Sequence, residues 1–140
     1  MSAMALKAYQ SVNTGARCAD ADRRELVVMM YDGAIDAVRL ARVHLAKREY
    51  RAASAAASRA SSIILGLRDT LDHGKGGDLA QHLFDFYSFL LRKLIAAAGP
   101  AGAPILTECE ELLAQVREAW AAISPATVGA VNQRMFVIRS

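Results

Sequence analysis

The sequence predicts an all-α protein: an antiparallel four-helix bundle with a mobile N-terminal segment and a short C-terminal tail. Alanine dominates the hydrophobic fraction of 54%, proline occurs only three times, and runs of Val, Ile and Thr are scarce. This composition favours helices over strands. Apolar residues also recur at spacings of three and four along four stretches, which breaks rich in glycine or proline separate. Helices of about 20 residues with such short connections are expected to lie antiparallel.

The first helix is predicted to begin at Arg23 and to end near Lys47. Residues 1–22 show no sustained apolar period, and we expect them to form the mobile N-terminal segment. Asp22 and Glu25 then match a capping box, in which the Asp22 carboxylate accepts a hydrogen bond from a first-turn N–H. The expected core stripe of this helix follows alternating spacings of four and three and consists of Leu26, Met30, Gly33, Ala37, Leu40 and His44.

The second helix is predicted from about Glu49 to Leu71, with small residues in its first half and isoleucines and leucines in its second. The adjacent Gly76 and Gly77 then favour a turn over a helix. Asp78 follows directly and is the predicted cap of the third helix, which is expected to run to the next break rich in glycine and proline.

The fourth helix carries apolar residues at helical spacing, Trp120 among them, and is predicted to stop before Pro125. The bundle would then span residues 23–124 as a single domain. Residues 125–140 are expected to form a short C-terminal tail. Its apolar residues 135–138 could pack on the bundle or contact a partner.

The third helix carries more apolar surface than a bundle core needs, because apolar residues cover roughly half its circumference. One interpretation is that this helix is simply the most buried element. The other is that part of its face, beside the small residues of the second helix, forms a groove for a partner helix. The candidate groove residues are Ala53, Ala56, Ala57, Ala60, Ile64, Leu83, Tyr87, Leu90, Leu91 and Leu94, and lesser candidates that flank the core stripe of the first helix are Met29, Tyr31 and Ile35.

Leu6 and Tyr9 stand three residues apart in an N-terminal segment otherwise too polar and too short to fold alone. Such a segment could lie across an exposed groove as a plug until a partner displaces it. The alternative is an ordinary frayed terminus.

Composition argues against several classes of function. The net charge is +3, and the 17 basic residues are spread along the chain, whereas nucleic-acid binders usually gather them into a patch. No apolar run approaches the roughly 20 residues needed to cross a bilayer, and the first ten residues lack the pattern of a secretory signal. Cys18 and Cys109 lack CxxC spacing, which favours a reduced, cytoplasmic protein.

No active site, metal site or cofactor is expected. His44 lies on the predicted core stripe of the first helix, where a buried histidine is the simpler interpretation than a ligand. His82 falls at the polar edge of the third helix, and the aspartates are distributed along the chain as solvated residues or caps. We therefore expect a binding protein and not an enzyme.

Four motifs follow one another along about residues 4–125. The motifs are Leu6-Lys-Ala-Tyr9-Gln-Ser-Val12, then Leu26-Val-Val-Met-Met-Tyr31-Asp32-Gly33-Ala34, then Gly76-Gly77-Asp-Leu-Ala with Leu83, Tyr87 and Leu91-Arg92-Lys93-Leu94, and finally Glu118-Ala119-Trp120. In this order they resemble the FliS family of flagellin export chaperones. This chain departs from the family pattern at Ala21-Asp22-Arg23, where the family commonly has Ser/Ala-Pro, and we expect the Asp22 cap to start the helix instead.

The resemblance implies a cytosolic four-helix bundle that binds the disordered C-terminal segment of flagellin, prevents premature polymerisation and holds the subunit for flagellar type III export. It implies that the N-terminal segment covers part of the binding surface in the free chaperone. For Asp32 it implies a structural hydrogen bond or salt bridge that fixes the first helix. It also leaves room for an anti-sigma regulator, an export-gate subunit or a co-chaperone as further partners of a monomer or weak dimer.

Two other functions stay open at this point. A histidine-phosphotransfer bundle would use His73, although that residue sits in a glycine-rich break where a stable helical position is needed. A structural bundle that forms a homodimer through the third helix would bury the same apolar surface that we assign to a client.

Overall fold

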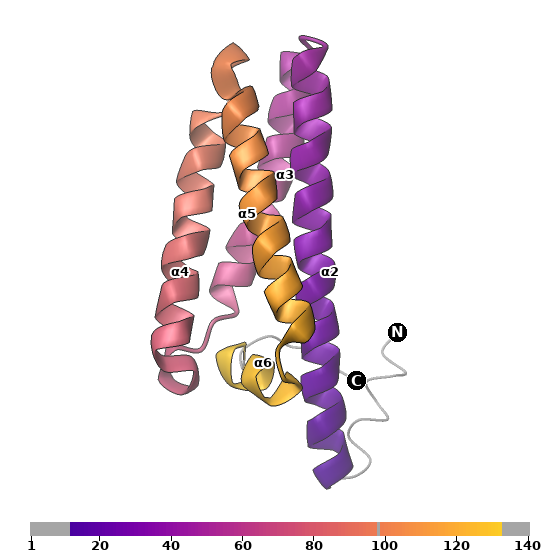
Figure 1. Ribbon diagram of the computed structural model, residues 1–140, viewed down its shortest axis with the longest axis vertical. Helices are drawn as coiled ribbons and strands as arrows, with labels where there is room; N and C mark the ends of the chain where they lie inside the picture. Colours follow the sequence, from indigo (N-terminus) through magenta and orange to yellow (C-terminus); the bar gives the residue numbers. More distant parts are fainter. Residues whose placement is uncertain (1–11, 98, 133–140) are drawn as a thin grey trace.

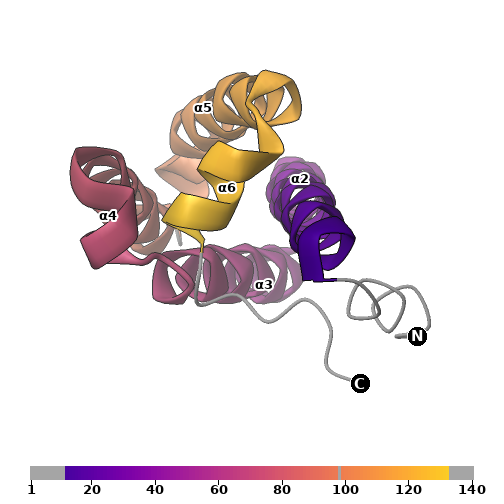
Figure 2. The ribbon, with the colours of Figure 1, turned by 90° about the horizontal axis from the view of Figure 1, so that it is seen from below.

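The computed structural model describes residues 12–97 and 99–132, and within these residues the protein is an all-α bundle without strands (Figure 1). The four long helices run alternately up and down, and seen from below they form a ring in which α5 lies next to α2 (Figure 2). The predicted four-helix bundle is thus confirmed. No described helix is apolar over a stretch long enough to span a membrane. The elements are α2 (Val12–Ala46), α3 (Tyr50–Asp69), α4 (His73–Ala96), a 3₁₀ turn (Pro100–Gly102), α5 (Ala103–Ala122) and α6 (Pro125–Val131).

Helix α2 begins at Val12, eleven residues before the predicted start at Arg23, so the predicted N-cap role of Asp22 is wrong. A capping box starts a helix only where the preceding backbone is not helical. Residues 12–21 include three alanines and no proline, so nothing in them stops a helix. Burial raises the pKa of Asp22, and the neighbouring Glu25 raises it further. Residues 1–11, which carry the predicted plug residues Leu6 and Tyr9, lie outside the described residues.

The buried face of α2 also differs from the predicted stripe. Leu40 is 39% exposed, whereas Tyr31 and Ile35, predicted to flank the core, are buried within it. The reason is that α2 contacts α3 on one side and α5 on the other, with α6 at its lower end, so its buried face is wide. The buried residues of α2 are Val27, Tyr31, Ala34, Ile35, Ala37, Val38, Ala41 and Leu45.

Helix α4 starts earlier than predicted, because its N-cap lies at Asp72 and not at Asp78. The Asp72 carboxylate accepts a hydrogen bond from the Lys75 N–H at 3.0 Å. The predicted break is present as a kink inside the helix, where Gly77 has φ 54° and ψ −133°. Only glycine reaches this region of backbone conformation without strain.

Helix α6 occupies the first part of the predicted short C-terminal tail, residues 125–140. Ser124 is its N-cap, with its hydroxyl oxygen 3.2 Å from the Thr127 N–H, and Pro125 is its first residue. This pair is a helix-start signature, although the sequence analysis took it only as a stop. Figures 1 and 2 show α6 beneath the bundle, where Val128, Val131 and Asn132 are buried. Residues 133–140 lie outside the described residues.

Candidate functional site

Most of the residues predicted to line a groove lie inside the bundle core. Leu91 and Ala57 are half-buried, and Met29 alone is clearly accessible, with 62% of its surface exposed. The buried alanines of α3 thus pack against neighbouring helices. The residues with at most 8% exposure are Tyr31, Ile35, Ala53, Ala56, Ala60, Ile64, Leu83, Tyr87, Leu90 and Leu94.

An open apolar cavity of about 100 Å³ lies instead between α4 and α5. Leu79 and Leu83 are four residues apart and therefore share one face of α4. Leu79 is 39% exposed at the mouth, whereas Trp120 is 3% exposed at the wall. Helices α4 and α5 pack less extensively on each other than α2 packs on α3, which leaves this space unfilled. The lining residues are Leu79, Leu83, Val116, Ala119, Trp120 and Ile123.

The apolar surface continues along the same edge of α4 towards the upper end of the bundle. Phe86 and Phe89 are half-buried and follow Leu79 at helical spacing. The Lys93 ammonium lies 5.4 Å from the centre of the Phe89 ring and 3.4 Å from a carboxylate oxygen of Glu108 on α5. This ion pair bridges the two helices above the apolar surface. An amphipathic helix could therefore place apolar side chains between α4 and α5 and its polar face in water.

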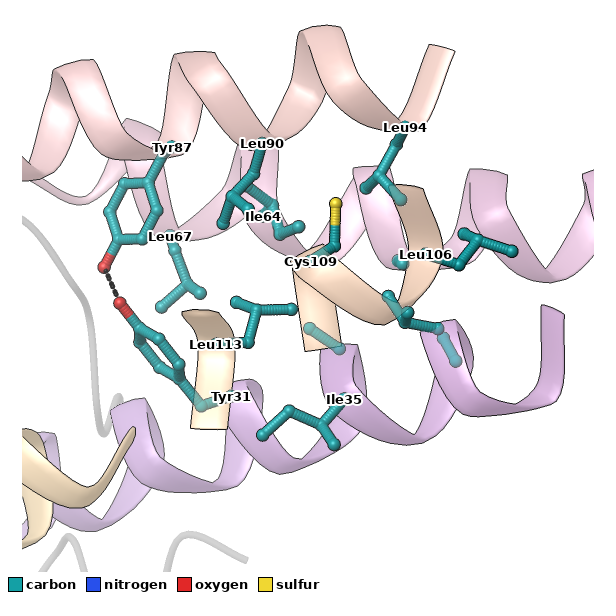
Figure 3. Close-up of a cluster of buried hydrophobic side chains, with 14 of the residues drawn as sticks. Tyr31, Ile35, Ile64, Leu67, Tyr87, Leu90, Leu94, Leu106, Cys109 and Leu113 are labelled. Carbon is teal, nitrogen blue, oxygen red and sulfur yellow. Dashed lines mark hydrogen bonds between the residues drawn. The ribbon is translucent and has the colours of Figure 1, made fainter. Parts of the chain in front are cut away.

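Trp120 separates this cavity from a buried tyrosine pair. The hydroxyl oxygens of Tyr31 and Tyr87 lie 2.7 Å apart and share a hydrogen bond between α2 and α4 (Figure 3). Burial raises the pKa of both phenols above the ordinary value, so both stay neutral. The Nε1 atom of Trp120 makes no hydrogen bond to either hydroxyl. The pair links the core of two helices and supplies no exposed reactive group.

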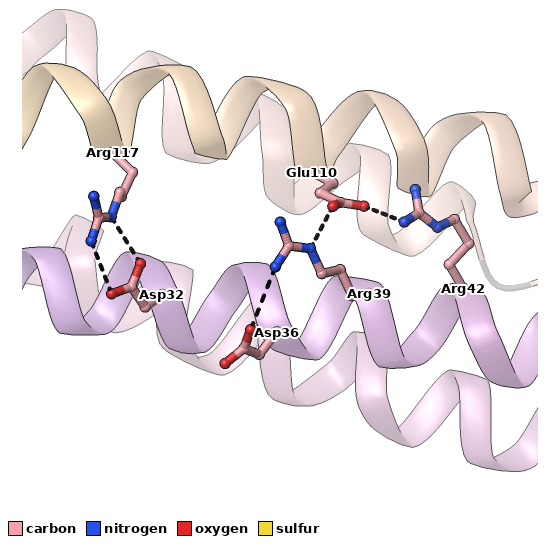
Figure 4. Close-up of polar contacts among 6 residues, drawn as sticks. All are labelled: Asp32, Asp36, Arg39, Arg42, Glu110 and Arg117. Atoms are coloured by element: carbon pink, nitrogen blue, oxygen red, sulfur yellow. Dashed lines mark hydrogen bonds and ion pairs between the residues drawn. The ribbon is translucent and has the colours of Figure 1, made fainter.

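Ion pairs join α2 to α5 on another face of the bundle (Figure 4). The Arg117 guanidinium donates to both carboxylate oxygens of Asp32, at 2.9 and 3.3 Å. Glu110 accepts from Arg39 at 2.6 Å and lies 2.7 Å from Arg42. Because these pairs are partly exposed, each contributes little to stability, but together they fix the register of the two helices.

Two glycines and two histidines that the sequence singled out each lie against another residue of the bundle. Gly33 lies against Ile63 of α3, and a Cβ on Gly76 would come within 3.2 Å of the Val131 backbone. The His73 ring packs edge-on against Phe84, and His44 lies 2.7 Å from a carboxylate oxygen of Glu49. Within the described part of the chain, no three His, Cys, Asp or Glu side chains are grouped as metal ligands would be.

Fold and surface together define an all-α bundle with an open apolar cavity between α4 and α5. The family described as flagellar protein FliS matches residues 5–127. The flagellar secretion chaperone FliS of Salmonella typhimurium is 36% identical over 124 residues, which cover 88% of this chain and 92% of that protein. The flagellar secretion chaperone FliSB of Pseudomonas aeruginosa is 30% identical over 120 residues, covering 86% and 95%. FliS of Escherichia coli is 27% identical over 125 residues, covering 87% and 92%.

The chain therefore belongs to the FliS family, a family of flagellar secretion chaperones.

Proposed function

We propose that this protein is a cytoplasmic export chaperone for flagellin. It binds the disordered C-terminal segment of flagellin, prevents premature polymerisation and keeps the subunit competent for type III export. The observation that supports this most directly is the apolar cavity between α4 and α5, in a chain whose relatives are named flagellar secretion chaperones. The terminal helices of such a client are amphipathic and would aggregate if exposed, so a chaperone must offer apolar surface to them.

The cavity between α4 and α5 is the proposed first contact for the client. Leu79 forms its mouth, and Val116, Trp120 and Ile123 form its walls. The residues predicted for a groove on α3 and α4 hold the helices that shape this cavity, and only Leu83 belongs to both sets. We keep Leu6 and Tyr9 as the proposed plug, which would compete with the client for apolar surface.

Weak net binding is compatible with release of the client to an export apparatus. Ordering a disordered segment offsets about 2–5 kcal/mol of the gross interaction free energy. A tethered plug lowers the apparent affinity further, because only the unplugged fraction can bind. The protein needs no cofactor for this role, and we propose that it acts as a monomer or weak dimer. An anti-sigma regulator, an export-gate subunit or a co-chaperone could bind the same bundle as further partners.

Substitution of Leu79 by glutamate tests the position of the client site. The variant Leu79→Glu places a charge at the mouth of an apolar cavity, and we expect affinity for the flagellin C-terminal segment to fall about tenfold or more. Calorimetric titration measures this affinity. Leu79 is 39% exposed, so the substitution leaves the core largely intact.

Leu65→Glu is the matched control, because Leu65 is 41% exposed within α3 and does not line the cavity. We expect this variant to bind the client as the wild type does. Equal loss of affinity in the two variants, or none in either, would show that the client binds elsewhere on the bundle.

A further inference from the structure

We propose that α6 is a positioning element, which fixes Ile123 as the lower wall of the cavity between α4 and α5. Ile123 is the C-cap of α5 and lines the cavity, and the next residue, Ser124, is the N-cap of α6. No flexible linker separates the cavity wall from α6. The position of Ile123 therefore depends on where α6 docks. The inference about client affinity rests on the proposed function, whereas the inference about the cavity wall does not.

Apolar contacts hold the middle and the end of α6 against the bundle. Val128 is 0% exposed and Val131 is 2% exposed. Helix α6 contacts α2 and α4, and the two views show it across the lower end of the ring (Figures 1 and 2). Gly76 of α4 allows this approach, because a Cβ at that position would lie 3.2 Å from the Val131 Cα atom.

Two polar contacts fix the end of α6 to the connection between α3 and α4. The Asp72 N–H donates to the Val131 carbonyl oxygen at 2.8 Å. The Thr70 hydroxyl lies 2.7 Å from the Leu67 carbonyl oxygen and 2.8 Å from the Asn132 side-chain amide. A hydroxyl has one hydrogen, so rotation of the amide by half a turn lets Asn132 donate to Thr70 while Thr70 donates to Leu67.

Ile123, the C-cap of α5, is also held by a contact from α2. Arg24 of α2 donates from Nη1 to the Ile123 carbonyl oxygen at 3.0 Å. Ile123 is thus placed between a contact from α2 and the docked α6. The FliS family match ends at residue 127, so the anchoring residues Val128, Val131 and Asn132 follow it in the chain. Release of α6 would free one side of Ile123 and open the lower end of the cavity.

The fluorescence of Trp120 measures the state of the cavity wall in the absence of a client. Trp120 is the only tryptophan in the chain, it lines the cavity beside Ile123, and it is 3% exposed. Opening of the cavity admits water to the indole, which shifts its emission to longer wavelength and raises quenching by acrylamide. This readout depends on the wall itself, and circular dichroism measures separately whether the bundle stays helical.

Val128→Asp tests the proposal, with Ala126→Asp as control, because Val128 is buried and Ala126 is exposed in the same helix. We expect Val128→Asp to shift the Trp120 emission to longer wavelength and to weaken binding of the flagellin C-terminal segment about tenfold, the effect of losing one apolar wall residue. Ala126→Asp should leave both unchanged. Unchanged emission in a helical Val128→Asp variant, or client affinity equal to or above wild type, would overturn the proposal.

Thr70→Val and Thr70→Ser give a milder second test, should Val128→Asp unfold the bundle. Thr70→Val loses the contact with Asn132 and should show the same direction of change in Trp120 emission, whereas Thr70→Ser keeps the hydroxyl and should restore wild-type emission. Identical emission in both variants would contradict an anchoring role for α6. If the wild type fails to bind the flagellin segment, the proposed function fails, and the fluorescence comparison still decides the role of α6.

Discussion

At the scale of single residues, three ionisable side chains are buried in the apolar core of this bundle. The hydroxyls of Tyr31 and Tyr87 satisfy one another across α2 and α4, and Cys109 is fully buried on α5. Burial raises the pKa of the Cys109 thiol from 9.0 to about 11, with Glu108 adding to the rise and Lys93 opposing it. All three groups stay neutral inside the protein at physiological pH. Neither the tyrosine pair nor the thiol has the depressed pKa of a reactive nucleophile.

These raised pKa values predict that the bundle loses stability in alkali. The Cys109 thiol ionises near pH 9 in the unfolded chain but only near pH 11 in the folded one, so its contribution is complete below pH 9 and is lost as the pH rises towards 11. One such group changes the free energy of unfolding by at most about 1.4 kcal/mol per pH unit. Tyr31 and Tyr87 act in the same direction above pH 10. Urea denaturation at a series of pH values measures this dependence.

Cys109→Ala is the control for the alkaline transition. Its stability should fall less steeply than that of the wild type between pH 9 and 10, because both proteins contain the tyrosines and only the wild type contains the thiol. Parallel curves for the two proteins over this window would show that the thiol does not account for the loss.

At the scale of elements, single residues start two of the helices and bend one of them. Asp72 caps α4, Ser124 caps α6, and Gly77 produces the kink inside α4. Gly76, the residue before the kink, lies against Val131 of α6.

Gly77→Ala should destabilise the protein by about 1 kcal/mol, because Gly77 has φ 54° and alanine is strained in that region. A Cβ at Gly77 would meet nothing within 4 Å, so the cost comes from backbone conformation alone. Gly99→Ala is a matched control, since it is equally open but has φ −133°. Chemical denaturation should show a loss for Gly77→Ala and little change for Gly99→Ala. Equal effects would mean that the left-handed conformation is not what the glycine supplies.

The sequence predicted where the helices lie along the chain better than it predicted which face of each helix is buried. The second helix was predicted from the small residues of its first half and the isoleucines and leucines of its second, and it is present as α3. That composition could not show that Ala53, Ala56 and Ala60 pack inward, since burial depends on contacts between distant residues. The partners Asp32 and Arg117 are 85 residues apart, and no local pattern pairs them.

The cavity between α4 and α5 could not be predicted for the same reason. Leu79 and Val116 line one cavity but lie on different helices, and a periodic pattern describes only one helix at a time. The available signal was the apolar half-circumference of α4, which exceeds what a core stripe needs. Helix α6 was missed although Ser124 and Pro125 mark its start, because they also end α5.

At the scale of the whole molecule, the surfaces between two pairs of helices differ in chemical character. Between α4 and α5 the surface is apolar and hollowed, and between α2 and α5 the ion pair of Arg117 with Asp32 crosses the helices. The short helix α6 closes the lower end. The chain belongs to the FliS family of flagellar secretion chaperones, and under the proposed function the apolar surface between α4 and α5 is the one that contacts the client.

Titration calorimetry of the full chain against the C-terminal segment of flagellin from the same organism tests the central claim most directly. The proposed function predicts saturable one-to-one binding with a large negative heat-capacity change, because a disordered segment would fold onto apolar surface. Absence of binding by a chain that circular dichroism shows to be helical would contradict the flagellin chaperone proposal and leave a FliS-family bundle with a different client.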